Sequence, residues 1–320
     1  MLNCARKLHD LPFTFPLLVK SFRLLQGAGV NVTPNHFYWP VPDLERLENR
    51  NWTIYSPPPS CRFDLNQQIT LAQELTENYG DECRFSNQSR DGEYHYQNGY
   101  FEAVDAEMAY GMVRNFKPRR IIEIGTGYST RILAAALQQN LQRDQIDGRL
   151  ISIDPHPERF STKLWSSRVE QIPVSVQDVP LEFFDFLDRN DILFIDSSHV
   201  VATGSDVLRE YLEILPRLNR GVLVHVHDIF LPSDYPRNAV LSNLWFWSEQ
   251  YLLQAFLSFN SRFEVLWGSS VIQTQLPWVL EECFPNWKHS YRRMPRSKRR
   301  FIPTFDGDRV WPSSFWMRRI

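Results

Sequence analysis

Residues Arg120-Ile-Ile-Glu-Ile-Gly-Thr-Gly-Tyr-Ser-Thr130 decide the fold class of this 320-residue chain. The stretch begins as a short apolar run, which predicts a buried strand, and it ends in Gly-Thr-Gly. Gly125 and Gly127 allow a tight turn from the strand into a helix, and they let a ligand approach the backbone closely. Residues 129–142 follow as the predicted helix, whose first N–H groups point at whatever lies above the turn.

The same alternation of strand and helix continues toward the C-terminus. The predicted strands are 150–154, 169–172, 191–196 and 221–226, and the predicted helices among them are 180–187 and 207–215. Continuous apolar strands indicate a parallel sheet covered on both faces, which is a doubly wound α/β fold. Right-handed crossovers place the carboxyl ends of the strands at one edge, where ligands bind. Gly125, Asp154, Asp196 and Asp228 are all expected at that edge.

The regions on either side of this core differ from it in composition. The expected regions are an irregular N-terminal extension at 1–100, the core at 101–273, a proline-rich basic insertion at 274–312, and a last core strand within 313–320. Further predicted elements are helices at 65–79, 103–115 and 244–259 and a strand at 263–267. Residues 57–59 are three prolines, which must be extended or turning.

Composition narrows the function classes. A formal net charge of −2 gives no global reason to expect nucleic acid as a partner. The apolar stretch 11–19 is too short to span a bilayer, and a docked segment is favoured over a membrane-surface helix. The widely spaced cysteines argue against a structural zinc site and fit a reducing cytoplasm. They are Cys4, Cys61, Cys83 and Cys283.

The glycine turn favours one kind of ligand. A dinucleotide-binding loop has a third glycine where this chain has Thr130, which argues against an NAD(P) oxidoreductase. The turn suits a ligand without a pyrophosphate, such as S-adenosylmethionine (SAM), and Asp154 can accept both ribose hydroxyls of an adenosine. Glycine pairs and terminal acids also arise for structural reasons, so the interpretation depends on finding both in this order. The expected SAM contacts are Glu123, Gly125, Thr126, Gly127, Ser129, Asp154, Gln177, Asp178 and Asp196, with Gln177 or Asp178 at the adenine edge.

Three longer motifs resemble those of a known family. They read KPRRIIEIGTGYST at 117–130, DILFIDSSHV at 191–200 and HDIFLPSDYP at 227–236. These resemble class I SAM-dependent methyltransferases, most of all a bacterial family with EIGTGYST, DILFIDSSHV and HDIFxPxDYP motifs. The resemblance implies a seven-strand Rossmann-like sheet whose last strand, here near 314–318, is antiparallel. It also implies SAM as the cofactor and a small-molecule or saccharide substrate.

Two polar clusters follow the fourth and fifth predicted strands and are expected to converge. They are Asp196-Ser-Ser-His199 and His225-Val-His-Asp228. Some sugar and catechol O-methyltransferases hold a divalent metal there, and Asp196 and Asp228 match two of their three ligand positions. The third position has His227, which suits zinc, iron or manganese better than magnesium. The alternative is structural: Asp228 caps a turn, while His225 and His227 share one face of their strand.

His199 resembles the candidate base of the same sugar methyltransferases. A neutral imidazole with a pKa near ~6.5 can take a hydroxyl proton at neutral pH. The alternative is a histidine bonded to a backbone carbonyl. The predicted function is O-methylation of a small or glycan-type hydroxylated acceptor by direct displacement, with Asp196 positioning the base or holding a metal. A non-catalytic module that binds SAM or a nucleotide is the other hypothesis.

A basic run without any acid lies in the predicted insertion. Such a run is either a solvated loop or a site for an anionic substrate such as a nucleotide-sugar. It consists of Lys288, Arg292, Arg293, Arg296, Lys298, Arg299 and Arg300.

Overall fold

The computed structural model describes residues 15–33, 39–52, 61–88, 90, 92–159, 163–165, 167–299, 302–304 and 306–320. The chain divides into two compact units, residues 1–52 and residues 53–320. The predicted turn at 57–59 and the start of the stretch 11–19 lie outside the described residues. No helix in the described ranges is long and apolar enough to cross a membrane.

In the described part of the first unit lie the helices α2 (Phe15–Gly27) and α3 (Leu44–Glu48). Asp43 begins α3, because its side chain accepts hydrogen bonds from the backbone N–H groups of Glu45 and Arg46. The second unit holds the sheet and every residue of the predicted site.

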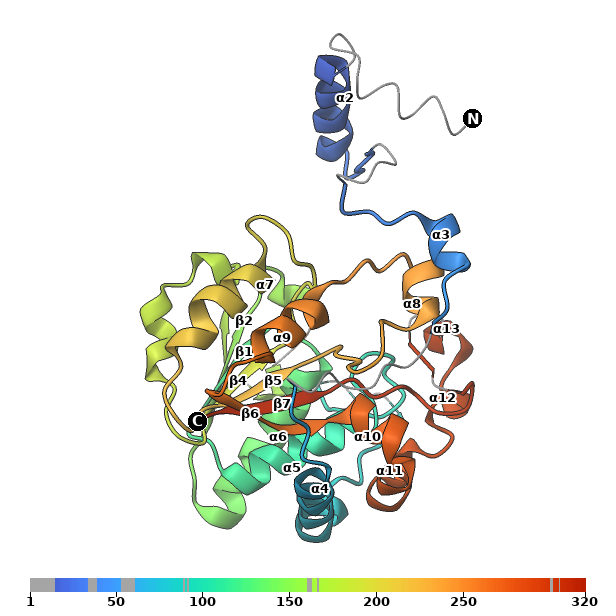
Figure 1. Ribbon diagram of the computed structural model, residues 1–320. Coiled ribbons are helices and arrows are strands. Elements are labelled where there is room, and N and C mark those ends of the chain that lie inside the picture. Colours follow the sequence, from blue (N-terminus) through green and yellow to red (C-terminus); the bar gives the residue numbers. More distant parts are fainter. Residues whose placement is uncertain are drawn as a thin grey trace. The chain divides into compact units, whose positions relative to one another are not determined.

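A seven-stranded sheet with the order β3-β2-β1-β4-β5-β7-β6 forms the centre of the second unit (Figure 1). The strands are β1 (Arg120–Ile124), β2 (Arg149–Ile153), β3 (Val169–Ile172), β4 (Ile192–Ile195), β5 (Leu223–Val226), β6 (Phe263–Gly268) and β7 (Phe315–Arg319). Strands β1 to β5 pair in parallel, and β7 runs antiparallel to both β5 and β6. The predicted doubly wound, Rossmann-like sheet with an antiparallel last strand is confirmed.

The strands alternate between two hydrophobic cores, one on each face of the sheet. In β4, Ile192 and Phe194 belong to the first core, while Leu193 and Ile195 belong to the second. This alternation explains why the strands read as continuous apolar runs. Helices α4, α5, α6 and α11 contribute to the first core, and α7 and α9 contribute to the second (Figure 1). The longer helices are α4 (Leu65–Tyr79), α5 (Asp105–Phe116), α6 (Tyr128–Asp144), α9 (Glu249–Leu257), α10 (Ser269–Gln275) and α11 (Pro277–Cys283).

Short helical segments complete the second unit. The α-helical ones are α7 (Asp206–Arg209), α8 (Arg237–Leu241), α12 (Ser290–Arg293) and α13 (Arg296–Arg299). The 3₁₀ segments are η1 (Gly80–Glu82), η2 (Pro157–Arg159), η3 (Lys163–Trp165), η4 (Val176–Asp178), η5 (Leu181–Phe186), η7 (Leu215–Arg217) and η8 (Pro285–Trp287). One π-helical turn, η6 (Glu210–Ile214), interrupts the helix predicted at 207–215.

Most predicted elements lie within two residues of the observed ones, but the helix predicted at 244–259 does not. It begins only at Glu249, because Leu244 has a φ of +58° and the segment up to Ser248 is irregular. A left-handed backbone at a branched residue ends helical geometry. The irregular segment carries Trp245 and Trp247 to the wall of the cavity described below.

The turn between β1 and α6 depends on Gly125. Its φ is +97°, and a Cβ at this position would lie 2.1 Å from the carbonyl oxygen of Asp196 at the end of β4. Gly127 differs, because its φ of −164° is ordinary extended backbone and the nearest atom to its Cβ position is the Ser129 hydroxyl at 3.8 Å. The fold therefore requires a glycine at position 125, whereas position 127 has room for a larger residue.

We expect Gly125→Ala to lower the free energy of unfolding by about 2 kcal/mol or more, since strained φ alone costs about 1–3 kcal/mol. Gly127→Ala is the matched control and should change stability by less than about 0.5 kcal/mol. Urea unfolding of both variants measures the difference. Equal losses in the two variants would contradict the assignment of the strain to Gly125.

Candidate functional site

A cavity of about 490 Å³ opens at the carboxyl ends of β1, β4 and β5. Its walls come from segments that are far apart in the sequence. The lining residues are Gly99, Tyr100, Phe101, Thr126, Gly127, Tyr128, Ser129, Asp196, His199, His227, Asp228, Trp245, Trp247, Ile302 and Pro303. The sheet thus brings the glycine turn, Asp196, His199 and the pair His227 and Asp228 to one place, as the strand order predicts.

Glu123 anchors the glycine turn from below. Its buried carboxylate accepts hydrogen bonds from the hydroxyls of Ser129 and Thr130, both at 2.7 Å, and of Ser152 at 3.0 Å. Thr130 also accepts the N–H of Gly127 at 2.9 Å, so the residue that replaces a third glycine holds the turn closed. Glu123 does not line the cavity. Burial raises the pKa of Glu123 to about 8, despite the three hydroxyl donors.

Asp154 follows β2 and holds the neighbouring turn. Its carboxylate accepts the backbone N–H of Thr126 at 2.8 Å and that of His156 at 2.6 Å. Each carboxylate oxygen has a second acceptor position, so these bonds leave capacity for ribose hydroxyls. Gln177 donates its amide to the carbonyl of Gly204 at 3.1 Å. Asp154, Gln177 and Asp178 do not line the 490 Å³ cavity, so this part of the predicted SAM site lies outside it.

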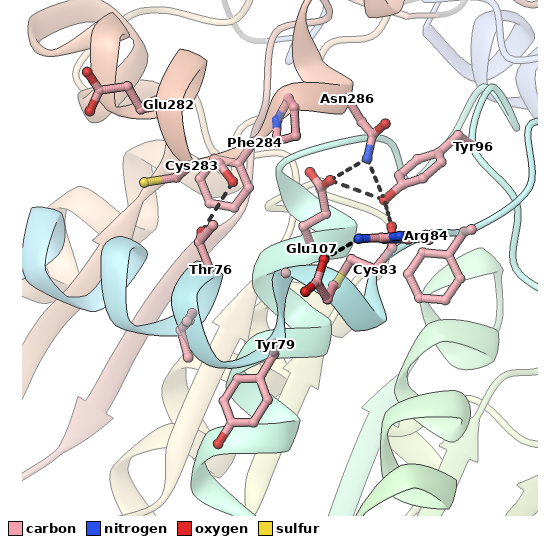
Figure 2. Close-up of a pocket in the computed structure, with 16 residues that line it drawn as sticks. Thr76, Tyr79, Cys83, Arg84, Tyr96, Glu107, Glu282, Cys283, Phe284 and Asn286 are labelled. Atoms are coloured by element: carbon pink, nitrogen blue, oxygen red, sulfur yellow. Dashed lines mark hydrogen bonds and ion pairs between the residues drawn. The ribbon is translucent and has the colours of Figure 1, made fainter.

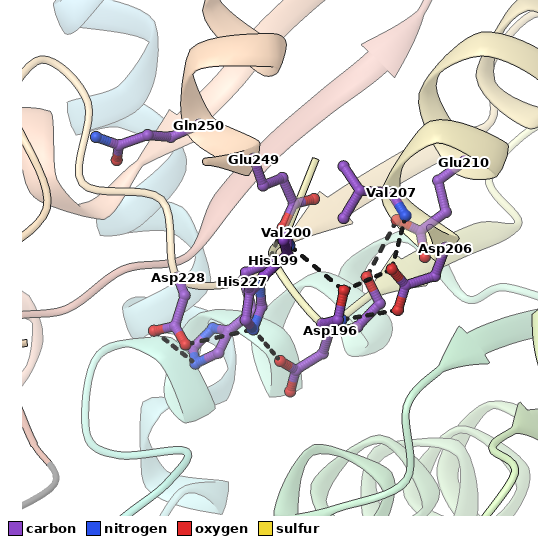
Figure 3. Close-up of polar contacts among 12 residues, drawn as sticks. Asp196, His199, Val200, Asp206, Val207, Glu210, His227, Asp228, Glu249 and Gln250 are labelled. Carbon is purple, nitrogen blue, oxygen red and sulfur yellow. Dashed lines mark hydrogen bonds and ion pairs between the residues drawn. The ribbon is translucent and has the colours of Figure 1, made fainter. Parts of the chain in front are cut away.

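His199 lies at the centre of a group of carboxylates (Figure 3). Its Nδ1 is 2.9 Å from Oε2 of Glu249, and its Nε2 is 3.5 Å from both Oδ1 of Asp196 and Oδ2 of Asp228. The His199 carbonyl accepts the N–H groups of Ser248 and Glu249, which fixes the start of α9 on it. The partner of the ring is therefore a carboxylate and not the backbone carbonyl that the structural alternative assumed.

These carboxylates set the protonation state of His199. Burial would lower the pKa of the imidazole, but the contacts with Asp196 and Glu249 and the charge of Asp228 raise it well above its usual value. Glu249 is itself buried beside Glu210, and burial raises the pKa of both carboxyl groups. Glu210 lies in the π-helical turn, and its Oε2 accepts the Ser197 hydroxyl at 3.2 Å. The carboxylates around the ring therefore favour its protonated form.

The two histidines of β5 play different parts. His225 is stacked on Phe194 with ring centroids 3.8 Å apart, and its Nε2 contacts the Ser314 hydroxyl at 3.0 Å. Burial lowers the pKa of His225 well below its usual value, which makes it a neutral core residue. His227 faces the cavity, and the charges of Asp228 and Asp196 raise its pKa although burial opposes this. The two rings lie on the same side of the strand, 5.7 Å apart, as their alternation predicts.

The predicted metal ligands do not form a metal site. Asp196, His227 and Asp228 lie near one another, but the His199 ring stands between the two carboxylates. His227 Nε2 is 3.8 Å from Asp228 Oδ1, and its Nδ1 has no hydrogen-bond partner within the described ranges. In the part of the chain that the structure describes, no group of three or more His, Cys, Asp or Glu side chains is arranged to hold a metal ion. These carboxylates are placed to hydrogen-bond with the His199 ring rather than to bind a metal cation together.

Aromatic side chains form the walls of the cavity, and sequence reasoning missed them. Trp245 and Trp247 are stacked with centroids 4.6 Å apart, and Trp247 lies 4.8 Å from the His199 ring. On the other side, Tyr100 stacks on Tyr128 at 5.9 Å. The Trp-Phe-Trp triplet at 245–247 was a visible signal, but it was read as part of a helix. No local signal pointed to Glu249.

The loop that carries Gly99, Tyr100 and Phe101 is fixed by its own polar groups. The amide nitrogen of Asn98 donates to the carbonyls of His95 and Phe101, both at 2.8 Å, and its oxygen accepts the N–H groups of the two residues after Gly99. Glu102 accepts the N–H of Gly99 at 2.6 Å. This wall of the cavity is therefore ordered in the free protein.

A second cavity, of about 590 Å³, lies between α4, α5 and the end of α11 (Figure 2). Glu107 is its buried carboxylate. It accepts hydrogen bonds from the Tyr96 hydroxyl at 3.1 Å, the Asn286 amide at 2.9 Å and the N–H of Val104 at 2.9 Å. Because these partners satisfy Glu107, this cavity carries a structural network.

The described members of the basic run do not line the 490 Å³ cavity. Lys298 donates to the carbonyl of Gln97 at 3.1 Å, Arg299 donates to that of Met294 at 2.8 Å, and Arg292 pairs with Asp308 at 3.1 Å. Arg300 lies outside the described residues, as does Cys4, while Cys61, Cys83 and Cys283 are buried free thiols.

Comparison with known proteins finds a family model that matches part of this chain. Residues 122–229 match the family model of a methyltransferase domain. An uncharacterized protein of Archaeoglobus fulgidus is 29% identical over 189 residues, which cover 54% of this chain and 84% of that protein. The matched range contains the glycine turn, Asp154, Asp196, His199 and Asp228.

Solved structures of methyltransferases are also similar to this chain. One described as cmcI with Mg and SAM is 18% identical with a TM-score of 0.32, over 49% of this chain and 60% of that one, which is less than two thirds of its length. The plantazolicin methyltransferase BamL, in complex with a triazolic desmethylPZN analog and SAH, is 12% identical with a TM-score of 0.35, over 79% and 96% of the two chains. The domain match and the strand order together support a class I SAM-dependent methyltransferase.

Glu123 should make stability depend on pH. Its pKa is about 8 in the folded chain against an ordinary value of 4.5, so the folded state binds the extra proton between these values. The free energy of unfolding should therefore fall as pH rises through this window, by up to about 1.4 kcal/mol per pH unit. In Glu123→Gln this contribution should be absent, as urea unfolding across the window will measure.

Glu74→Gln, at an exposed position of α4, is the control and should keep the wild-type slope. Because His199 contributes a slope of the same sign in every variant, only the difference between curves reports on Glu123. Parallel curves for wild type and Glu123→Gln would mean that the buried carboxyl is ionised in the folded chain.

Proposed function

We propose that this chain is a SAM-dependent O-methyltransferase that acts on a hydroxylated small or glycan-type acceptor. One observation carries the proposal: Nε2 of His199 faces a cavity that is also lined by Gly127 and Ser129 of the glycine turn. A proton acceptor and a nucleoside-binding turn thereby share one space. Direct methyl transfer to an oxygen needs alignment and proton removal, and both are available there.

The glycine turn fits SAM. The Cβ position of Gly127 is open, α6 begins at Tyr128 with its free N–H groups toward the cavity edge, and the whole turn is held by Glu123 from inside. When bound, SAM supplies an electrophilic methyl group. We assign the ribose to Asp154, the adenine edge to Gln177 or Asp178, and the remaining contacts to Thr126, Ser129 and Asp196.

His199 is proposed as the base. Its bond to Glu249 holds the Nδ1 proton, so that the second proton leaves from Nε2 and the free lone pair points at the cavity. Asp196 and Asp228 hold the ring from the cavity side and stabilise the imidazolium that forms when the acceptor hydroxyl loses its proton. The raised pKa makes Nε2 a strong base, but only the deprotonated fraction of the enzyme can act.

This account needs no metal ion. Since the His199 ring stands between Asp196 and Asp228, activity should survive excess chelator. Loss of activity on chelation, with recovery on adding manganese or zinc, would instead mean that the ring moves away and that Asp196, His227 and Asp228 close around a cation.

We expect Asp154→Ala to weaken SAM binding at least about tenfold, because each charge-assisted hydrogen bond to ribose is worth about 1.5–3 kcal/mol. Isothermal titration calorimetry with SAM or S-adenosylhomocysteine measures this. Asp185→Ala is the matched control, since this carboxylate pairs with Arg217 at the exposed surface and should not affect affinity. Unchanged affinity in a folded Asp154→Ala protein would refute the ribose assignment.

His199→Ala should lower kcat by about 10²–10⁴ while SAM affinity stays nearly constant. The wild-type rate should fall at acidic pH. The midpoint of this fall, the acid limb of the pH profile, should lie above ~6.5 because the pKa of His199 is raised. Glu249→Gln removes one of the charges that raise this pKa, so its acid limb should move to lower pH. The acid limb should be missing in His199→Ala.

The acceptor for these assays comes from a panel of hydroxylated compounds incubated with labelled SAM. A loss of less than about threefold in kcat for His199→Ala, with chemistry rate-limiting, would assign the histidine a structural role. If the acid limb of the pH–rate profile has the same midpoint in Glu249→Gln as in the wild type, the limb reports the ionisation of another group.

A further inference from the structure

We propose that the acceptor is an uncharged, sugar-type hydroxylated ring that lies on Trp247, and that anionic acceptors such as sugar phosphates and nucleotide-sugars are disfavoured. This inference deepens the proposed methyltransferase function and rests on it. Three features of the cavity lead to it: the tryptophan pair, the charge of the lining, and the position of the base.

The tryptophan pair is a flat apolar part of the cavity wall. Trp245 and Trp247 are stacked at 4.6 Å with an angle of 20° between their planes, and both are half-buried. Tyr235 contacts the edge of Trp247 at 5.8 Å and 71°, which fixes the indole in place. A rigid aromatic face binds the C–H face of a ring at little entropic cost.

The base lies next to this wall. The His199 ring is 4.8 Å from Trp247 at an angle of 59°. A ring that packs against this wall is therefore placed near the His199 ring. Asp196 and Asp228, each 3.5 Å from that nitrogen, are acceptors for further hydroxyl groups of the same ring.

The charge of the lining argues against an anion. Among the described lining residues there are two carboxylates and no lysine or arginine. An anionic group held close to one of these carboxylates is repelled by it, and the repulsion grows as water is excluded from the cavity. His199 and His227 offset the carboxylates in the free protein, but His199 must be neutral to act as the base.

The nearest described cations are engaged elsewhere. Lys298 donates to the carbonyl of Gln97, and Arg131 lies over the Tyr128 ring at 5.1 Å with its guanidinium toward the carbonyl of Glu93. Neither side chain lines the cavity. We therefore propose a neutral acceptor for this cavity rather than the anionic substrate that the basic run suggests.

The test measures binding and does not depend on turnover. The protein is saturated with S-adenosylhomocysteine, and saturation-transfer NMR follows two probe sets: methyl glycosides and short neutral oligosaccharides of common hexoses, and the matching sugar 1-phosphates. We expect at least one neutral probe to bind, and its 1-phosphate to bind at least about tenfold more weakly. Trp247→Leu should weaken the neutral probe by about tenfold or more without changing affinity for S-adenosylhomocysteine.

Trp278→Leu is the matched control, because Trp278 is 42% exposed on α11 and does not line the cavity. Trp247→Phe keeps an aromatic face and should recover part of the binding of the neutral probe. If Trp247→Leu does not fold, Trp247→Phe replaces it, and it should bind the neutral probe more weakly than the wild type. Tighter binding of the phosphates, or unchanged binding by Trp247→Leu, overturns the inference. If S-adenosylhomocysteine binds and no neutral probe does, the acceptor class is wrong and the methyltransferase proposal stands. If S-adenosylhomocysteine itself does not bind, both fail.

Discussion

The backbone of Gly125 lies against the carbonyl oxygen of Asp196, and the geometry of the site depends on this contact. The N–H of Asp196 donates to the carbonyl of Ile124, and the N–H of Gly125 donates to that of Ile153, both at 2.9 Å. These main-chain bonds continue the pairing of β1 with β2 and β4 beyond the ends of the strands. They therefore set the distance between the turn proposed for SAM and the carboxylate that faces His199. A side chain at position 125 would push these two apart.

Several ionisable groups near this edge of the sheet are buried, and burying them is costly. His199, Glu249, Glu210 and Glu123 are all buried, and three of them are acids whose pKa values burial raises. Buried ionisable groups rarely add net stability, even when they are paired. The π-helical turn at Glu210 is a further local irregularity of the kind that recurs at functional sites. The proton transfer that we propose gives His199 and Glu249 a role at this edge.

The aromatic walls and the acidic floor divide the cavity between two tasks. The floor, made by the ends of β4 and β5, carries the titratable groups. The walls, made by the loop with Tyr100 and the segment with Trp247, carry none of the charge and shape the space for a ring. Asn98 and Glu102 hold the first wall in place before any ligand arrives. A preformed wall lowers the entropy cost of aligning an acceptor with the base.

The sequence by itself determined the sheet and the edge at which the site lies. Apolar runs that end in Gly-Thr-Gly or in an acid predicted the strands to within two residues, because strand burial and chain reversal leave a local record in residue type. The same record predicted that Gly125, Asp154, Asp196 and Asp228 would meet. It could not show that Glu123 would turn inward to three hydroxyls, since that depends on helix α6 packing over β1 and β2.

Only the tertiary structure decided how the predicted groups are used. The partner of His199 is Glu249, fifty residues away, and the helix predicted across 244–248 is broken so that Trp247 reaches the same ring. The His199 ring lies close to both predicted aspartate ligands, and three described members of the basic run, Arg292, Lys298 and Arg299, contact Asp308 or main-chain carbonyls. The physical reason is common to all of these. Hydrogen bonds, ion pairs and ring contacts between distant segments are settled by the packing of whole elements, and residue type and spacing along the chain carry no record of that packing.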